Sequence, residues 1–279
     1  MCVCVCALSS SLQALQFSPD GGWLASVGCP PESSLALWDT ASGTLVAAVT
    51  LEAPVAGLSW LSGAAQPTFY TLGPDGLTQW QLGPEDLTRL DVHLGQALAS
   101  VQLTAFSCRG PGVHDGGGRC AVLLAGDSRG RVWQLTLDGE QDLRSYSTLA
   151  EVEGQGISAL CAAPGGQLIA VGTAPGALLL LRPGEGDSWS VGCCQQLDGE
   201  VLRVQLDPGA EAALAESAAG TLWSVHGAGR LAEVLLCGIQ HGMTAWDHSC
   251  GVAWRPAPSL LALASEAGVA LWQTVRLHT

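Results

Sequence analysis

No lysine occurs in this chain of 279 residues, so its 11 basic residues are all arginine, against 25 aspartates and glutamates. The formal net charge is −14, and charged residues make up only 13% of the chain. An acidic surface repels phosphate backbones and anionic lipid headgroups, so we expect neither nucleic-acid nor membrane binding. No apolar run reaches the roughly 18 residues that a membrane-spanning helix needs.

Signals for export, disulfides or metals are also missing. The start, MCVCVCALSS, has no positive n-region and too short an apolar run for a signal peptide, which predicts a cytoplasmic protein. Cys2, Cys4 and Cys6 alternate with valine, which on a strand places their sulfurs on one face, and no second half of a zinc site follows. We predict packed thiols here and at Cys193-Cys194, with metal or redox chemistry as the lesser alternatives, and no cofactor.

The most regular segment is Phe17–Asp39, FSPDGGWLASVGCPPESSLALWD. Its Ser18–Gly21 predicts a tight turn, because proline presets one dihedral angle and glycine accepts a positive φ. Strands are expected at Trp23–Val27, at Leu35–Trp38 and, after another turn, at Thr44–Thr50. The segment is therefore a compact run of short antiparallel strands.

This segment resembles one unit of the WD-repeat family, whose pattern runs Phe-Ser-Pro-Asp-Gly, Leu-Ala-Ser-Gly and Leu-Trp-Asp. One such unit cannot bury both of its faces, so the chain needs further copies, at intervals of about 40–45 residues plus loop insertions. Two columns of mostly aromatic anchors repeat in this way. The first column is Trp38 (followed by Asp39), Trp80, Trp133, Leu179, Trp223 and Trp272, and the second is Phe17, Trp60, Phe106, Ala162, Leu206 and Trp254.

Two columns in register over six units predict an all-β fold, a β-propeller of WD-repeat type. We expect about six four-stranded blades, with an incomplete seven-bladed ring as the alternative. The expected domain is single, 1–279, with blades at approximately 12–52, 53–95, 96–148, 149–192, 193–236 and 237–279.

Some positions depart from the family pattern. Leu179 stands where the fourth blade should carry tryptophan. The family's Gly-His, whose histidine joins a turn aspartate, a serine or threonine and the tryptophan in a hydrogen-bond network, has its closest match at Asp247-His248-Ser249. We therefore expect hydrophobic packing between blades, rather than these networks, to hold the fold.

Two loops carry residues of a kind that can bind ligands. The glycine-rich insertion Arg109–Gly118 has no following lysine or helix, so it predicts a hairpin loop rather than a phosphate cradle. Arg129 and Arg131 flank Gly130 on a turn and are expected to be solvated loop charges.

No catalytic constellation stands out, and we predict that the protein is not an enzyme. There is no Gly-x-Ser-x-Gly elbow for a nucleophile. Ser217–Trp223 resembles the Asp-box turn of sialidase-like propellers but has neither its aspartate nor its spacing, so a glycosidase-like propeller stays a remote alternative. No catalytic, cofactor-binding or metal-binding residue is assigned, and the partner-binding residues are unknown.

The family resemblance implies a scaffold that binds other proteins. Gly199–Asp207, Ala218–Trp223 and Trp23–Gly28 are similar to passages in the large multi-propeller WD proteins of centriolar and ciliary microtubule walls. The resemblance implies a module of a microtubule-associated protein in cilium assembly, located in the cytoplasm at the centrosome, centriole or ciliary base. The alternative is a general cytosolic adapter in signalling or ubiquitin ligation.

Overall fold

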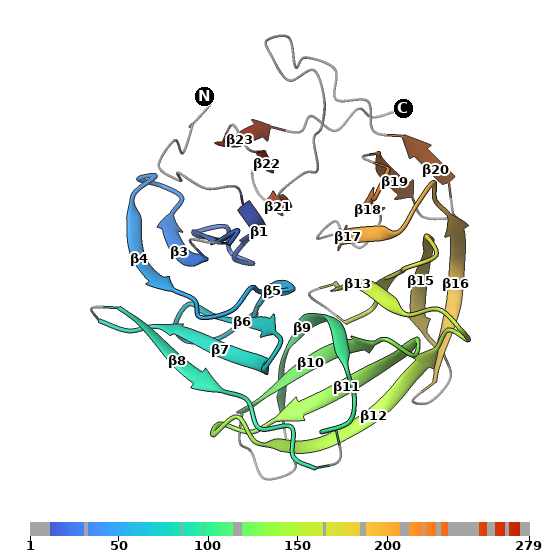
Figure 1. Ribbon diagram of the computed structural model, residues 1–279, viewed down its shortest axis with the longest axis horizontal. Helices are drawn as coiled ribbons and strands as arrows, with labels where there is room; N and C mark the ends of the chain where they lie inside the picture. The colour runs from blue at the N-terminus through green and yellow to red at the C-terminus, as the bar shows by residue number, and fades with distance from the viewer. Residues whose placement is uncertain are drawn as a thin grey trace. The chain divides into compact units, whose positions relative to one another are not determined.

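The computed structural model describes residues 12–30, 33–84, 86–96, 98–113, 119–163, 166–184, 188–206, 212–219, 221–226, 230–233, 251–255, 260–265 and 268–273. Their strands form six antiparallel sheets, five of four strands and one of three (Figure 1). The prediction of an all-β fold is confirmed. These residues contain no helix, and hence none that is long and apolar enough to cross a membrane.

The described chain divides into two compact units. The first comprises the described parts of 1–60, 64–89 and 247–279, and the second those of 61–63 and 90–246. The strands of the first unit are β1 (Leu12–Phe17), β2 (Trp23–Gly28), β3 (Ser34–Asp39), β4 (Leu45–Thr50), β5 (Gly57–Trp60), β6 (Thr68–Gly73), β7 (Gly76–Leu82), most of β8 (Leu87–Asp91), β21 (Gly251–Arg255), β22 (Leu260–Ser265) and β23 (Gly268–Gln273).

The second unit contains three sheets of four strands, ordered β12-β11-β10-β9, β13-β14-β15-β16 and β17-β18-β19-β20. Its strands are β9 (Leu103–Val113), β10 (Arg119–Asp127), β11 (Arg131–Leu137), β12 (Leu143–Glu151), β13 (Ile157–Ala162), β14 (Ile169–Thr173), β15 (Ala177–Pro183), β16 (Trp189–Gln196), β17 (Val201–Leu206), β18 (Ala212–Ser217), β19 (Leu222–His226) and β20 (Arg230–Glu233). β12 and β16 extend past residues 148 and 192, where the expected blades ended.

The first unit confirms the predicted turn. Gly21 adopts a φ of +70° and donates its N–H to the Ser18 carbonyl oxygen over 2.8 Å. Downstream, the first two sheets share one apolar core, in which Leu37 of β3 and Phe69 of β6 are fully buried. The Trp60 indole N–H also donates to the Gln16 carbonyl of β1 over 3.0 Å. Neighbouring sheets of this unit are therefore joined by packing and by a hydrogen bond.

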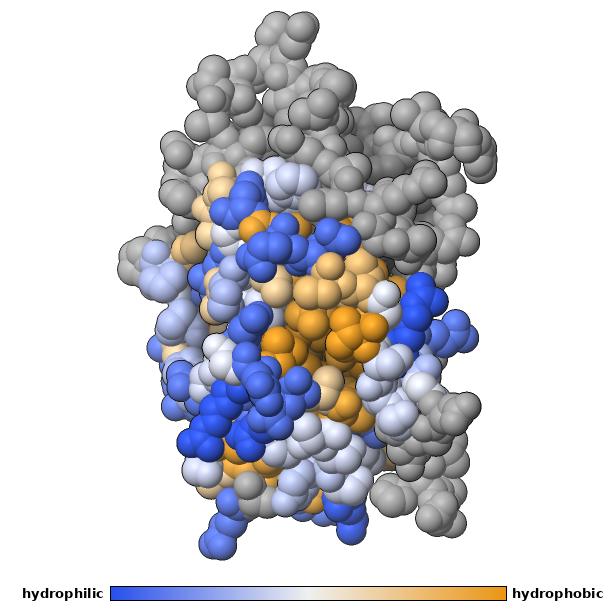
Figure 2. Space-filling view, turned by 90° about the vertical axis from the view of Figure 1, so that its right-hand side faces the viewer, coloured by the Kyte–Doolittle hydropathy of each residue, from blue (hydrophilic) through white to orange (hydrophobic). Residues whose placement is uncertain are grey.

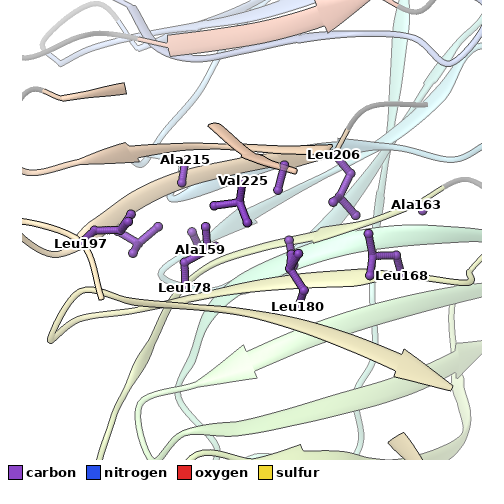
Figure 3. Close-up of a cluster of buried hydrophobic side chains, with 12 residues drawn as sticks. Ala159, Ala163, Leu168, Leu178, Leu180, Leu197, Leu206, Ala215 and Val225 are labelled. Carbon is purple, nitrogen blue, oxygen red and sulfur yellow. The ribbon is translucent and has the colours of Figure 1, made fainter. Parts of the chain in front are cut away.

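In the second unit, alternate residues of β15 pack into two different hydrophobic cores. Leu178 and Leu180 of β15 pack toward the β17–β20 sheet, and Figure 3 shows such side chains filling the space between the two sheets. Leu179 and Leu181 pack toward the β9–β12 sheet. Since strand side chains alternate between the faces, the apolar run of β15 supplies both interfaces.

Glycines permit the close approach of these sheets. A Cβ atom added to Gly126 of β10 would lie 2.3 Å from Ile157 Cγ2, and one added to Gly172 of β14 would lie 2.4 Å from Val201 Cγ1. Ile157 and Val201 each begin the first strand of the next sheet. At each of the two interfaces, a β-branched side chain of the next sheet therefore occupies the space where any residue larger than glycine would place its Cβ atom.

The predicted loop at Arg109–Gly118 needs correction. β9 continues through Arg109 to Val113, and β10 begins at Arg119, so strand pairing extends well into the insertion. The remaining residues, 114–118, lie outside the described part, as do Cys2, Cys4, Cys6 and the Asp247–Ser249 segment.

Candidate protein-docking surface

The predicted repeat anchors lie inside the sheets or at their edges. Six of them are buried: Phe17, Trp38, Trp60, Trp80, Phe106 and Trp133. Leu179 is buried as well, Trp223 is half-buried, and Asp39 ends β3 with its carboxylate accepting the N–H groups of the following turn. Trp254 and Trp272 belong to β21 and β23, but their side chains are outside the described set. The seven buried anchors are therefore packing residues and do not form the surface of the described sheets.

The described tryptophans of the third strands all place their indole N–H in a hydrogen bond. Trp38 donates to Ser26 Oγ over 3.0 Å, and Trp80 donates to Thr71 Oγ1 over 2.9 Å. In the second unit, Trp133 donates to Asp127 and Trp223 to Asp198, each over 3.0 Å. Polar contacts therefore accompany the hydrophobic packing in these sheets, and no histidine takes part in these four hydrogen bonds. That packing between sheets contributes more to the fold than the polar networks stays a prediction.

Asp127 organises a buried network at the end of β10. Its side chain is 1% exposed and accepts an ion pair from Arg131 at 2.7 Å as well as the Trp133 indole N–H. Desolvation raises the pKa of this carboxyl, but the hydrogen bonds that it accepts have a larger opposite effect, so the pKa lies below its ordinary value. The donors are the backbone N–H groups of Arg131 and Arg129 and the side chains of Trp133 and Arg131. The Arg131 guanidinium also lies over the Trp133 ring, 4.6 Å from its centroid. The prediction of a solvated Arg131 is wrong.

Asp198 makes a comparable network that the sequence analysis missed. Asp198 lies just before β17. Its carboxylate accepts a hydrogen bond from the Thr221 hydroxyl over 2.7 Å and one from the Trp223 indole N–H over 3.0 Å. Desolvation raises its pKa, but hydrogen bonds from Ser217, Thr221 and Trp223 outweigh it and lower the pKa overall. The Ser217–Trp223 turn thus serves the fold, with an aspartate near the place where the family has histidine.

Charged groups also meet at Arg203 and Glu216, whose nitrogen and oxygen lie 3.0 Å apart between β17 and β18. Desolvation raises the pKa of Glu216 despite the attraction of Arg203. Within the described residues, no cluster of three histidine, cysteine or acidic side chains could hold a metal ion. The buried carboxylates Asp127 and Glu216 are thus paired within the fold, whereas the side-chain oxygens of Gln16 and Gln205 are buried without a hydrogen-bond partner in the described part of the chain.

The surface offers a different kind of site. The exposed large apolar side chains in the described part lie mainly on the outermost strands of their sheets: Leu45, Val46, Leu90, Tyr146 and Val191, with Leu202 on β17. Val191 of β16 is the most exposed of them, at 55%. Figure 2 shows apolar surface bordered by polar residues on the side of the molecule that carries β16. Contiguous exposed apolar surface is characteristic of interaction sites.

We call the exposed edge of β16, with Val191, Cys194 and the half-buried Trp189, the β16 surface. Trp189 packs against the same core as Leu149 and Ala150 of β12, so the surface continues from a buried cluster. Cys194 is exposed whereas Cys193 is half-buried, which confirms strand packing for Cys193 and corrects it for Cys194.

Arg109 of β9 contacts the first residue of the β16 surface, Trp189. Its guanidinium donates to Gln134 Oε1 over 2.6 Å and to the Gly166 carbonyl over 3.3 Å. It also lies 5.4 Å from the centre of the Trp189 ring. Arg109 of β9 therefore contacts β11, the β13–β14 turn and Trp189 of β16.

Comparison with known proteins identifies the fold. No family model matches the chain. The β-propeller domain of Cps50 (Swd1) from Myceliophteria thermophila superposes with a TM-score of 0.62 at 18% identity, covering 95% of this chain and 84% of that domain. With its repeated four-stranded sheets, this chain has the β-propeller fold, and it carries the tryptophan anchors on which the resemblance to WD-repeat units rests.

Two curated proteins are distantly similar in sequence. Centriole proteome protein 16 of Chlamydomonas reinhardtii is 29% identical over 231 residues, which cover 77% of this chain. WD repeat-containing protein 90 of Mus musculus is 26% identical over 236 residues, again 77% of this chain. The chain spans 11% and 12% of the length of these relatives, so it corresponds to a small part of each.

Proposed function

We propose that this chain is a non-catalytic protein-docking module that acts at the centriole or the base of the cilium. The similarity to Centriole proteome protein 16 supports the proposal most directly, because it extends over 77% of this chain. It matches 11% of that relative, as expected for one module of a larger scaffold.

The geometry is suited to docking. The sheets are fixed by shared cores and tryptophan hydrogen bonds, whereas the outer strands leave apolar side chains exposed. A rigid framework with exposed apolar edges lets a partner bind without a large ordering cost in the module.

Charge narrows the kind of partner. The chain carries a formal net charge of −14, so long-range attraction does not favour an acidic microtubule surface. We infer that the module binds other proteins of the centriole or axoneme rather than tubulin itself.

Proximity labelling tests this function. The chain, fused to a biotin ligase, is expressed in ciliating cells, and its labelled neighbours are compared with those of an unrelated WD-repeat propeller of similar size. Enrichment of centriolar or axonemal proteins is the expected result. Labelling confined to ubiquitin-ligase or kinase components would contradict the proposal and favour the general adapter.

A further inference from the structure

We propose that the open edge of β16 binds an extended segment of a partner protein by strand addition, and that this segment alternates apolar and acidic residues. The proposal rests on the proposed docking function and names the surface and the peptide chemistry. β16 is the last strand of its sheet and pairs only with β15. No other strand in the described part of the chain pairs with its outer edge, although β12 of the neighbouring sheet contacts β16. The backbone groups of this edge can pair with an added strand.

β16 differs from most of the other outer strands in charge. β8 contains Arg89 and Asp91, β12 contains Arg144 and Glu151, and β20 likewise contains one residue of each sign. The sequence of β16, WSVGCCQQ, has no charged residue. Charged side chains on an edge strand discourage pairing with another chain, and β16 has none to do so.

β4, LVAAVT, is also an uncharged fourth strand. Exposed acidic residues follow both strands: Glu52 after β4, and Asp198 and Glu200 after β16. The difference is an exposed cation beside β16, because Arg182 of β15 pairs with Ser190, whereas β3 beside β4 has no basic residue. None of the ion pairs in the described residues involves Arg182. An acidic side chain is therefore favoured next to Arg182, and β4 offers no such cation.

A glycine brings this cation to the edge. A Cβ atom added to Gly192 would lie 3.2 Å from Arg182 Cδ and 3.4 Å from Arg182 Nε, so the arginine stem lies along the strand at that position. Gly192 is also the bulged residue, because Leu180 pairs with Cys193 while Leu181 pairs with Val191. The bulge thus places a guanidinium beside the edge of an otherwise uncharged strand.

The two faces of β16 differ in chemistry, so each face would favour a different kind of side chain on the added strand. Cross-strand partners share a face, so Val191 lies on the face of Leu181 and Cys194 on that of Leu179. Leu179 and Leu181 belong to the core shared with β9–β12, whereas Cys193 packs on the opposite core. An added strand presents alternate residues to the two faces. Apolar residues would meet Val191, and acidic residues on the other face would meet Arg182.

Peptide display on the intact chain tests the proposal. A library of random twelve-residue peptides is selected on the wild type, and the enriched peptides are measured by fluorescence anisotropy against Arg182→Glu and Val191→Thr. Leu45→Thr on β4 is the matched control, because Leu45 is 51% exposed and Val191 is 55% exposed. Circular dichroism and the melting temperature establish that each variant folds.

The expected peptides alternate apolar and acidic residues. Arg182→Glu should weaken their binding about tenfold, since a like charge replaces a complementary one, and Val191→Thr should weaken it severalfold. Leu45→Thr should leave it unchanged, and hydrogen exchange should slow at β16 amides when peptide is bound. Enrichment of basic peptides or of helical spacing, binding that survives both β16 variants, or no enrichment would each overturn the proposal.

The outcome is separable from that of the proposed function. If centriolar neighbours are labelled equally by wild type and by the β16 variants, strand addition at β16 is wrong and the docking function stands. If peptides bind the β16 edge but no centriolar neighbour is labelled, the cellular role is wrong and the surface stands.

Discussion

The β9–β12 and β13–β16 sheets lie side by side in one unit and hold their third strands differently. Trp133 is fixed by a buried carboxylate and an arginine, whereas Leu179, at the corresponding position, offers no polar atom. The two anchors are nevertheless almost equally buried, at 8% and 7% exposure. Packing between sheets therefore determines where the anchor sits, and the polar network adds order to the adjoining turn.

The same two sheets differ at their outer edges. β12 carries charges, and the exposed Arg144 guanidinium forms an ion pair with Asp138 at 2.7 Å. β16 has no charge and exposes Val191. The β9–β12 sheet thus has charged groups both in its interior network and on its outer strand, whereas the β13–β16 sheet has an uncharged anchor and an uncharged outer strand.

The largest expected effects come from removing the anchors themselves. Trp133→Ala should lower the free energy of unfolding by about 4 kcal/mol, and Leu179→Ala by about 3 kcal/mol, because both leave cavities between sheets. Urea denaturation measures both, with the exposed Leu202→Ala as a control near zero. A loss under about 1 kcal/mol for Leu179→Ala would show that its sheet is not held by packing.

The glycine contacts should come next. Gly126→Ala and Gly172→Ala should each lower the free energy of unfolding by about 2 kcal/mol, since the added methyl group overlaps Ile157 or Val201. Gly139→Ala is the matched control, because a Cβ atom there meets nothing within 4 Å. Equal stability of the three variants, measured by the same denaturation, would contradict close packing at these interfaces.

A smaller effect distinguishes the buried carboxylates by pH. The folded-state pKa of Asp127 is lowered, so its contribution is present above the unfolded pKa of about 3.9 and is lost as pH falls through the folded pKa. The pKa of Glu216 is raised in the folded state, so its contribution to the free energy of unfolding has the opposite pH dependence. That contribution is present below the unfolded pKa and is lost as pH rises through the folded pKa.

Thermal unfolding between about pH 5 and pH 3 measures the difference. Asp127→Asn should make the loss of stability on acidification shallower, and Glu216→Gln should make it steeper. The same change of slope in both variants would contradict the opposite pKa shifts.

The smallest effect on stability concerns the thiols. Burial raises the pKa of Cys161 to about 11, with a hydrogen bond involving the Leu206 backbone opposing it. At pH 8 roughly one part in a thousand of that thiol is ionised. Alkylation followed by peptide mapping should modify the exposed Cys194 first and the half-buried Cys161, whose pKa is raised, much more slowly. Cys194→Ser should change stability by less than about 0.5 kcal/mol. Labelling of Cys161 in the folded protein as fast as that of Cys194 would contradict its raised pKa.

The sequence was sufficient for the class of fold because turn chemistry and spacing repeat. The turn at Gly21 and the strands around Trp38 follow from local preferences that the tertiary structure leaves in place. Leu179 could be placed without its tryptophan because the alternation along β15 preserves its face. These features depend on neighbours in sequence, which a single sequence contains.

The polar networks and the β16 surface could not be predicted in the same way. Asp198 lies 25 residues from Trp223, and its role depends on how the loop before β17 approaches the next hairpin. The position of Arg182 beside Gly192 depends on a bulge that no local pattern announces. One usable signal was present, namely that β16 is the longest uncharged outer strand among those described.

Affinity capture from ciliating cells with the wild type, the Arg182→Glu/Val191→Thr double variant and Leu45→Thr tests the central claim most directly. The account predicts that wild type and Leu45→Thr enrich the same centriolar or axonemal proteins by quantitative mass spectrometry, and that the double variant loses at least one of them. Identical sets for all three proteins, or no centriolar protein in any, would contradict a docking module that works through β16.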